Sequence, residues 1–531
     1  MKRYTNLLLS LTTGILLWVA WPTSAFTLFI FIAWIPLLWL ESKPISNRRF
    51  FGLTYITMFT WNVLTTWWIW NASEIGAVLA FLANSLLMCL PWLAFRVTKK
   101  ILGTVAGYIS LIAFWLCFEY IHLHDWGLSW PWLTLGNVFA THIEWIQWYE
   151  YTGTSGGSLW VIIVNILLFL HVKNNFSRGN SKSYKNLLAA IILLILPVVF
   201  SSMISVHKTI PGRKSNIVVI QPNVDPYEKI SAGSFEMQLQ KLIHLSESEI
   251  DSNTALLVWP ETALYTENGI EEDKMKENPL LNPLWDFLKQ HSTITLFTGI
   301  ESYRVFNAKN APSAKPMQEA GYYYESYNGS ALLDSSGALS YYHKSMLVPG
   351  VETLPWFLRF IDKWFEKFGG TTAGYTKQKE RTPLVDSKHG YIIAPAICYE
   401  SIYGEFMSKY IRNGANIICI ITNDGWWGNT PGYRQHMNYA RLRAIETRKW
   451  VVRSANTGIS CFIDPYGYVI NPQPWDKAAA IKLNKPVYND HQTFFVKHGD
   501  ILSKIITVIS IILILLNIGY WIRKKFFIKK K

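Results

Sequence analysis

The stretch YIIAPAICYESIYGEF, residues Tyr391–Phe406, joins an apolar run to a cysteine that a tyrosine and a glutamate follow at once. An apolar run of this length, bounded by glycine and polar residues, predicts a buried strand, so Cys398 is expected where that strand ends. A side chain at such a junction can point into a cleft. A lone cysteine in apolar surroundings is more often an inert small hydrophobe, so Cys398 is a candidate nucleophile only if other reactive groups join it.

Similar runs surround this stretch and predict a layered α/β domain. Two segments with helical spacing, Ser234–Ile250 and Tyr433–Trp450, alternate with the expected strands. Strands that alternate with helices over almost 300 residues favour helices packed on sheets. The further expected strands are SNIVVIQPNV (Ser215–Val224), NTALLVWPETA (Asn253–Ala263), STITLFTGIES (Ser292–Ser302), YNGSALLDSSGAL (Tyr327–Leu339) and GANIICIITND (Gly414–Asp424).

Outside this domain the sequence is that of a membrane protein. Half of the 531 residues are hydrophobic and 15% are aromatic. Several apolar runs approach the roughly 20 residues that cross a bilayer. We expect about eight spans, near Leu7–Ala20, Phe26–Leu40, Phe51–Trp70, Ile75–Phe95, Ile101–Ile121, Leu159–Val172, Leu187–Val206 and Ile501–Ile522, of which the first and sixth are short enough to be buried helices instead.

The formal charge of +14 reflects membrane topology and does not indicate a nucleic-acid partner. Clusters of Lys and Arg precede the first span, separate spans 2 from 3, 4 from 5 and 6 from 7, and follow the last span. The opposite connections, such as His122–Ser158, contain no Lys or Arg. Because basic clusters stay on the cytoplasmic side, this pattern predicts that both termini are cytoplasmic.

This topology sets the expected domain boundaries. Residues 1–204 would form seven transmembrane helices, 205–500 a catalytic domain outside the cytoplasm, 501–522 the eighth span and 523–531 a basic cytoplasmic tail. The first segment also fits a signal peptide ending at Ala25, although the apolar run that follows favours a retained span. We expect a bacterial inner-membrane protein with its catalytic domain in the periplasm.

The five cysteines show no metal-ligand spacing, and we expect no metal and no cofactor. Cys89 and Cys117 fall in spans, while Cys419 and Cys461 fit buried strand positions. A free thiol outside the cytoplasm is exposed to oxidation, so a functional reason for Cys398 becomes more plausible.

Two further groups stand at strand ends like that of Cys398. Glu261 follows an apolar run and Trp259–Pro260, where its carboxylate can act as a general base. Lys344 follows another expected strand, where its ammonium can stabilise an oxyanion and favour a thiolate. Glu352, eight residues later, can orient or neutralise that lysine. Taken singly, each has a commoner structural explanation as a surface charge or a turn residue.

Together, the order Glu261, Lys344, Cys398 resembles the Glu–Lys–Cys triad of the nitrilase superfamily. The resemblance spans Ile217 to Tyr466 and includes TNDGWWG (Thr422–Gly428) and the segment Ala440–Gly458. It implies an α-β-β-α sandwich.

A nitrilase-like domain between membrane spans resembles, more specifically, the apolipoprotein N-acyltransferase family over essentially the whole chain. SWPWLTLGN (Ser129–Asn137) and WYEYTGTSGGSLW (Trp148–Trp160) are similar to that family's loop before the sixth span. The resemblance implies that Glu352 is a second essential glutamate and that Tyr399 and Glu400 support the cysteine.

The implied activity is ping-pong acyl transfer through a thioester on Cys398. A phospholipid would donate the acyl chain, and the N-terminal amine of diacylglyceryl-cysteine in an apolipoprotein would accept it. Leu354–Gly370, with aromatic residues at helical spacing, fits an interfacial arm that gates acyl chains, or else a helix packed on its own domain. The expected arm residues are Trp356, Phe357, Phe360 and Trp364.

Three alternatives stay open at this point. A membrane-anchored amidase acting on a small amide would use the same triad, although one span would anchor it. A transporter or receptor that only binds a ligand would carry intramembrane charges, which the spans nearly lack. A papain-like pair of Cys398 with His343 or His436 would replace the glutamate base.

Overall fold

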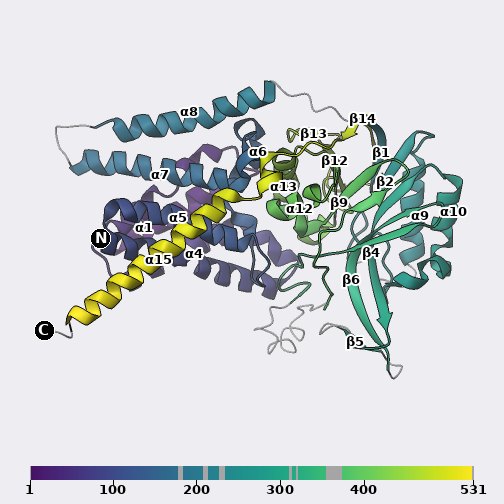
Figure 1. The fold of residues 1–531 in the computed structure, drawn as a ribbon, viewed down its shortest axis with the longest axis horizontal. Coiled ribbons are helices and arrows are strands. Elements are labelled where there is room, and N and C mark those ends of the chain that lie inside the picture. Colours follow the sequence, from purple (N-terminus) through teal and green to yellow (C-terminus); the bar gives the residue numbers. More distant parts are fainter. Residues whose placement is uncertain are drawn as a thin grey trace. The chain divides into compact units, whose positions relative to one another are not determined.

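The computed structural model describes residues 2–177, 183–206, 213–226, 234–309, 314–317, 321–353 and 374–528. Contacts divide the chain into two units (Figure 1). The helical unit holds Met1–Trp67, Ala77–His207 and His498–Lys531, and the α/β unit holds Trp68–Gly76 and Lys208–Lys497. The predicted domain boundaries stay predictions.

Within the residues that the structure describes, the helical unit contains five helices that are long and apolar enough to cross a membrane. Only 17% of the apolar window in α8 and 22% of that in α15 is buried, so most of their surface faces outward, as a lipid-facing helix requires. The five are α4 (Glu74–Leu102), α5 (Thr104–His122), α7 (Thr154–Ser177), α8 (Lys185–Val206) and α15 (Ile501–Ile528).

The other three expected spans differ from these five. The apolar helix Tyr4–Val19, within α1 (Lys2–Val19), is shorter. The second expected span is a 3₁₀ helix, Thr27–Phe31, followed by α2 (Ile35–Glu41), which begins with Pro36 in its first turn, where proline is preferred. The third expected span is α3 (Asn47–Thr66), which has the length but not the hydropathy. The count of eight spans therefore stays a prediction.

The α/β unit is built on two sheets, which confirms the predicted fold class. The larger has the strand order β14-β1-β2-β4-β6-β5, with β3 beside β4 and β7 beside β6. Its strands are β1 (Arg213–Gln221), β2 (Thr254–Val258), β3 (Ile270–Glu271), β4 (Thr295–Phe306), β5 (Lys315–Pro316), β6 (Tyr323–Asp334), β7 (Leu339–His343) and β14 (Ala479–Tyr488).

The smaller sheet has the order β13-β12-β11-β10-β9-β8, with β9, β10 and β11 parallel. It faces the larger sheet, because β11 contacts β1 and β9 contacts β6 (Figure 1). Its strands are β8 (Leu384–Asp386), β9 (Tyr391–Ile397), β10 (Ile417–Thr422), β11 (Val451–Ala455), β12 (Cys461–Ile463) and β13 (Val469–Ile470).

Helices cover the outer faces of both sheets. The helices α9 (Ser234–Glu247) and α10 (Asn282–Gln290) pack on the larger sheet, and α12 (Gly404–Arg412) and α13 (Pro431–Thr447) pack on the smaller one. The helix α13 begins as its sequence predicts, since the Thr430 hydroxyl accepts from Gly432 N and Pro431 takes the first helical position.

One predicted strand is wrong in extent. The expected strand Tyr327–Leu339 is two strands, because β6 ends at Asp334 and β7 starts only at Leu339. Gly337, with a φ of 78°, reverses the chain between them, and few residues other than glycine adopt that conformation. This turn sends β7 back along β6 and so determines where Lys344 emerges.

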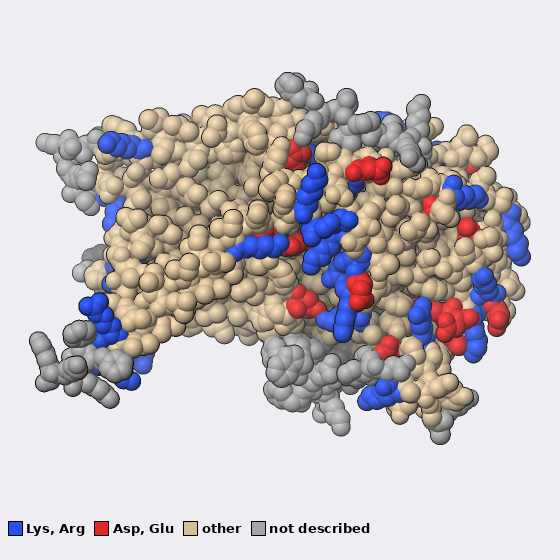
Figure 2. Space-filling model, in the orientation of Figure 1, with Lys and Arg blue, Asp and Glu red and all other residues tan. Residues whose placement is uncertain are grey.

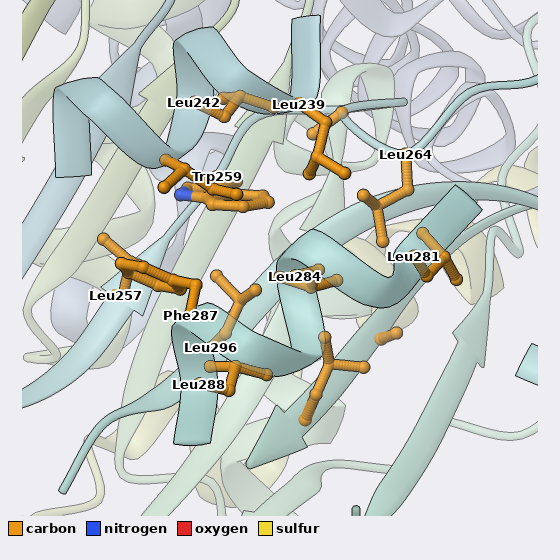
Figure 3. Close-up of a cluster of buried hydrophobic side chains, with 14 of the residues drawn as sticks. Leu239, Leu242, Leu257, Trp259, Leu264, Leu281, Leu284, Phe287, Leu288 and Leu296 are labelled. Carbon is orange, nitrogen blue, oxygen red and sulfur yellow. The ribbon is translucent and has the colours of Figure 1, made fainter. Parts of the chain in front are cut away.

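The core between the larger sheet and its helices centres on Trp259 (Figure 3). Its side chain is fully buried, and its indole Nε1 donates to the Ser246 hydroxyl of α9 at 2.9 Å. Figure 3 shows leucines of α9 and α10 around it. Because Trp259 stands two residues before Glu261, the same core anchors the chain that carries this carboxylate.

We predict that Trp259→Ala destabilises the α/β unit strongly. Removing a fully buried indole leaves a cavity and removes the donor to the Ser246 hydroxyl, at a cost of about 3–5 kcal/mol. The measurement is the thermal unfolding midpoint of the purified full chain. Trp285→Ala, at a partly buried position against the same core, is the control and should lower the midpoint less. Equal shifts in the two variants would contradict this role of Trp259.

Candidate active site

Cys398 occupies a strained turn at the end of β9. The strand ends at Ile397, and Cys398 has a φ of 51°, in the left-handed region that residues other than glycine rarely adopt. The 3₁₀ helix Cys398–Ile402 follows immediately. The sharp change of direction places the partly buried cysteine at the carboxyl end of the smaller sheet's parallel strands.

Glu261 lies past the end of β2, in the larger sheet. Its Oε2 accepts from the backbone N–H of Asn423 at 3.0 Å, directly after β10 of the other sheet. Gly299 of β4 packs directly against this segment. Any residue larger than glycine at position 299 would place its Cβ 2.6 Å from Glu261 Cα and 2.5 Å from Pro260 O. The close approach therefore requires a glycine at this point of β4.

Lys344 and Glu352 complete a buried cluster with Glu261. The Lys344 Nζ lies 2.7 Å from Glu352 Oε1 and 3.4 Å from Glu261 Oε1, and Lys344 is only 1% exposed. Asn328 of β6 donates from Nδ2 to both carboxylates, at 3.0 Å to Glu261 and 2.9 Å to Glu352. The structure thus brings together three of the predicted residues, and the amide of Asn328, which the sequence analysis missed, joins them.

The charges in this cluster act on one another. Burial alone would lower the pKa of Lys344, but the carboxylates of Glu352 and Glu261 outweigh it and raise that pKa. Lys344 is therefore a permanent cation. Burial and the Glu261 carboxylate raise the pKa of the Cys398 thiol, whereas the Lys344 ammonium and a hydrogen bond with Thr422 lower it. The resting thiol stays protonated until a base removes its proton.

Glu400 ties the lysine segment to the cysteine turn. The fully buried carboxylate accepts from Ser345 N at 2.7 Å and Met346 N at 3.1 Å through Oε1, and from Ile397 N at 2.8 Å through Oε2. The Tyr342 hydroxyl also donates to Oε1, at 2.7 Å. Burial raises the pKa of Glu400, and these hydrogen bonds oppose that rise. Glu400 therefore acts through the residues on either side of it.

Tyr399, the other predicted supporting residue, has a different position. Its side chain is buried, and its ring packs edge-on against that of Tyr403, with the centroids 5.3 Å apart. This contact lies within the turn that follows Cys398. It fits a role in holding that turn.

A second buried group supports the turn, and of its members the sequence analysis named only His436 and missed Asp424 and Arg453. Asp424 lies between His436 Nδ1 at 2.9 Å and an Arg453 guanidinium nitrogen at 2.7 Å. Burial would raise the pKa of Asp424, yet Arg453 and His436 hold it at about 2, so it stays ionised. The His436 Nε2 in turn lies 3.1 Å from the carbonyl oxygen of Cys398 and 2.9 Å from the Ser401 hydroxyl.

These contacts bear on the papain-like alternative. Both ring nitrogens of His436 have oxygen partners in the scaffold, among them the main chain of Cys398. His343 stacks on Tyr327 with the ring centroids 3.7 Å apart, and its Nε2 lies 2.7 Å from Glu272. The surroundings of both histidines fit structural roles.

The segment Trp68–Gly76 connects α3 to α4, yet it belongs to the α/β unit. The Trp68 ring packs on Trp427 with the centroids 4.7 Å apart, and Asn71 Nδ2 donates to Trp427 O at 2.9 Å. The Trp427 ring meets the His436 ring edge-on at 5.5 Å. The connection between α3 and α4 therefore supports the turn that carries Cys398. The sequence analysis missed this contact, because the two segments lie more than 350 residues apart.

Some predictions lie beyond what the structure describes. The expected arm residues Trp356, Phe357, Phe360 and Trp364 fall in 354–373, outside the described residues. Across the described ranges, no group of three or more His, Cys, Asp or Glu side chains could hold a metal ion. The expectation of chemistry without a metal or cofactor stays a prediction.

Comparisons with known proteins match both units. Residues 217–485 match the carbon-nitrogen hydrolase family, and residues 13–167 match the apolipoprotein N-acyltransferase N-terminal domain. The apolipoprotein N-acyltransferase of Chlorobaculum tepidum is 28% identical over 515 residues, which cover 94% of this chain and 93% of that protein.

Two further proteins are similar to the chain. The apolipoprotein N-acyltransferase of Rickettsia prowazekii is 30% identical over 404 residues, covering 75% of this chain and 74% of that protein. The crystal structure of Saccharomyces cerevisiae Nit3, of the nitrilase superfamily, is 16% identical with a TM-score of 0.36, covering 53% of this chain and 93% of that one. The chain therefore belongs to the apolipoprotein N-acyltransferase family, and its α/β unit is a carbon-nitrogen hydrolase domain.

Proposed function

We propose that this chain transfers an acyl chain from a membrane phospholipid to the N-terminal amine of diacylglyceryl-cysteine in apolipoproteins, through a thioester on Cys398. The chain is an N-acyltransferase by its family and its carbon-nitrogen hydrolase domain. Its apolar helices and its bacterial relatives indicate a bacterial membrane protein. The chemistry below assigns a role to each residue of the buried cluster.

In the first half-reaction, Cys398 attacks the ester carbonyl of the phospholipid. Glu261 takes the thiol proton as the C–S bond forms, which its proximity to both Cys398 and Lys344 supports. Lys344 stabilises the tetrahedral oxyanion, a contribution of about 3 kcal/mol for a well-placed donor. When the C–O bond breaks, Glu261 returns its proton to the leaving alkoxide. The products are a lysophospholipid and an acyl thioester.

In the second half-reaction, the lipoprotein amine attacks the thioester. Glu261 removes a proton from the attacking nitrogen, and Lys344 again faces the oxyanion. The C–S bond breaks, the thiolate recovers a proton from Glu261, and an amide is released. The same three groups thus serve both halves, as ping-pong transfer requires.

Glu352 and Glu400 have supporting roles in this scheme. Glu352 holds the Lys344 ammonium at 2.7 Å and keeps it charged inside the protein. Glu400 links the backbone after Lys344 to the residue before Cys398, so it sets the spacing between cation and nucleophile. Both act on the position of the reacting groups.

One observation carries the proposal. A buried, permanently charged lysine lies between two carboxylates. Cys398 occupies a left-handed turn, and the charges of Glu261 and Lys344 act on the pKa of its thiol. A structural cysteine needs no such neighbours. A small-amide hydrolase would use the same groups, but the family assignment over both units does not favour it.

The location follows from the substrates and the charge pattern. Both substrates carry acyl chains, so we place the catalytic domain, residues 205–500, at the periplasmic face of the inner membrane with both termini in the cytoplasm. The aromatic arm around Trp356 and Trp364 would enter the headgroup region and gate the acyl chains.

The proposal predicts a covalent acyl adduct. Purified full-length protein incubated with phospholipid should gain one acyl mass in intact-mass spectrometry. Cys398→Ala should gain none, whereas Cys419→Ala, which removes a buried thiol of β10, should still be acylated. A wild type without an adduct, or an undiminished adduct on Cys398→Ala, would refute the mechanism.

The charges around the thiol predict opposite pH shifts in two variants. Because the Glu261 carboxylate raises the pKa of Cys398, Glu261→Gln should move the alkylation of Cys398 by iodoacetamide to lower pH. Because Lys344 lowers that pKa, Lys344→Met should move the alkylation to higher pH. The measurement is the alkylation rate against pH by mass spectrometry, with Cys398→Ala as the blank. Shifts in the same direction would mean that these charges do not act on this sulfur.

A further inference from the structure

A hollow in the α/β unit, away from the catalytic cluster, has basic side chains at half of its lining positions. It has a volume of about 570 Å³ and lies between the segment before β8 and the last turn of α12. Figure 2 shows a band of Lys and Arg side chains on the face of the molecule that it draws. The lining residues are Lys379, Glu380, Arg381, Thr382, Pro383, Lys409, Arg412 and Asn413.

The cations of this hollow form no ion pair within the part of the chain that the structure describes. Glu380 is part of the lining. Even so, no ion pair with Asp or Glu is formed among the described residues by any of the four cations, Lys379, Arg381, Lys409 and Arg412. Other cations of the same unit behave differently, since the exposed Lys274 and Lys289 and the half-buried Lys482 each pair with a carboxylate. Four cations and one carboxylate leave the lining with a net positive charge, which attracts an anion.

Two of these cations are also held in place. The Arg381 guanidinium lies over the Phe406 ring at 4.1 Å and donates to Lys379 O at 2.8 Å. Its Nε is buried and has no hydrogen-bond partner within the described residues. Arg412 donates from Nε to Val496 O at 3.0 Å. Arginines fixed in this way are suited to binding phosphate oxygens.

The hollow is connected through the chain to the start of the apolar helix α15. Val496, the partner of Arg412, stands five residues before Ile501, where the apolar helix α15 begins. Five residues span at most about 17 Å even when fully extended. A basic site joined by so short a segment to a helix apolar enough to cross a membrane is suited to phospholipid headgroups.

We propose that this hollow binds the phosphate of an anionic phospholipid at the membrane surface and so docks the α/β unit there. The helix dipole of α12 favours cations at its C-terminus and so accounts for Lys409 and Arg412. It does not account for Lys379 and Arg381, because these two residues lie outside the helix. An anionic headgroup near a basic surface is attracted by each cation in turn. The site is separate from the proposed acyl-transfer chemistry.

The test compares lipid binding by the full-length protein in a neutral detergent. Native mass spectrometry would measure the retention of phosphatidylglycerol against phosphatidylcholine. Lys379→Glu combined with Lys409→Glu should reduce phosphatidylglycerol retention at least about tenfold, because two attractive charges become repulsive. The matched control, Lys276→Glu with Lys289→Glu, reverses two exposed lysines elsewhere in the unit and should retain the lipid.

Three outcomes decide the proposal. A preference for phosphatidylglycerol that only the first pair of substitutions abolishes would support it. An equal loss of phosphatidylglycerol retention in both double variants would mean that overall charge, and not this hollow, attracts the lipid. A wild type that retains phosphatidylglycerol and phosphatidylcholine equally would also overturn the proposal. Displacement of the lipid by inorganic phosphate at equal concentration would assign the site to a soluble anion instead. Acylation of Cys398 from phosphatidylcholine should be unchanged in both pairs, which shows that they fold.

Discussion

The arrangement of this site depends on one buried cation. Lys344 is almost completely enclosed, and a lone ammonium in that position would be costly, so it requires the carboxylates of Glu352 and Glu261 beside it. The amide of Asn328, which donates to both, keeps the two like charges in place around the lysine. The same charges govern the thiol of Cys398, and one electrostatic balance therefore determines both the scaffold and the chemistry.

The fold makes this electrostatic balance possible because the strand ends that carry the charged groups and the thiol come from two facing sheets. Glu261 and Lys344 follow strands of the larger sheet, and Cys398 follows a strand of the smaller one. Glu400 and the backbone of Asn423 connect the two sides through hydrogen bonds. A sandwich of two sheets can hold the groups rigidly because neither side depends on a free loop alone.

Local patterns predicted much of this structure, and long-range packing explains what they missed. The apolar runs correctly predicted that Glu261, Lys344 and Cys398 follow strand ends, because a few consecutive apolar residues are enough to predict a buried strand. Asn328 in the middle of β6 and Gly299 in β4 looked like ordinary strand residues, since only the neighbouring strands give them a role. The support from Trp68 was missed for the same reason, and the predicted strand Tyr327–Leu339 extended past the turn at Gly337.

The most direct test of the account is the rate of thioester formation in Lys344→Met, measured in a single turnover by intact-mass spectrometry. Methionine keeps the length of the lysine stem and removes the ammonium, with its charge and its hydrogen bonds to Glu352 and Glu261. The account predicts that the variant keeps its fold. It also predicts that the variant forms the thioester about 100-fold or more slowly than the wild type, because one oxyanion donor is lost. Acylation of Cys398 at an unchanged rate would contradict the central role of this cation.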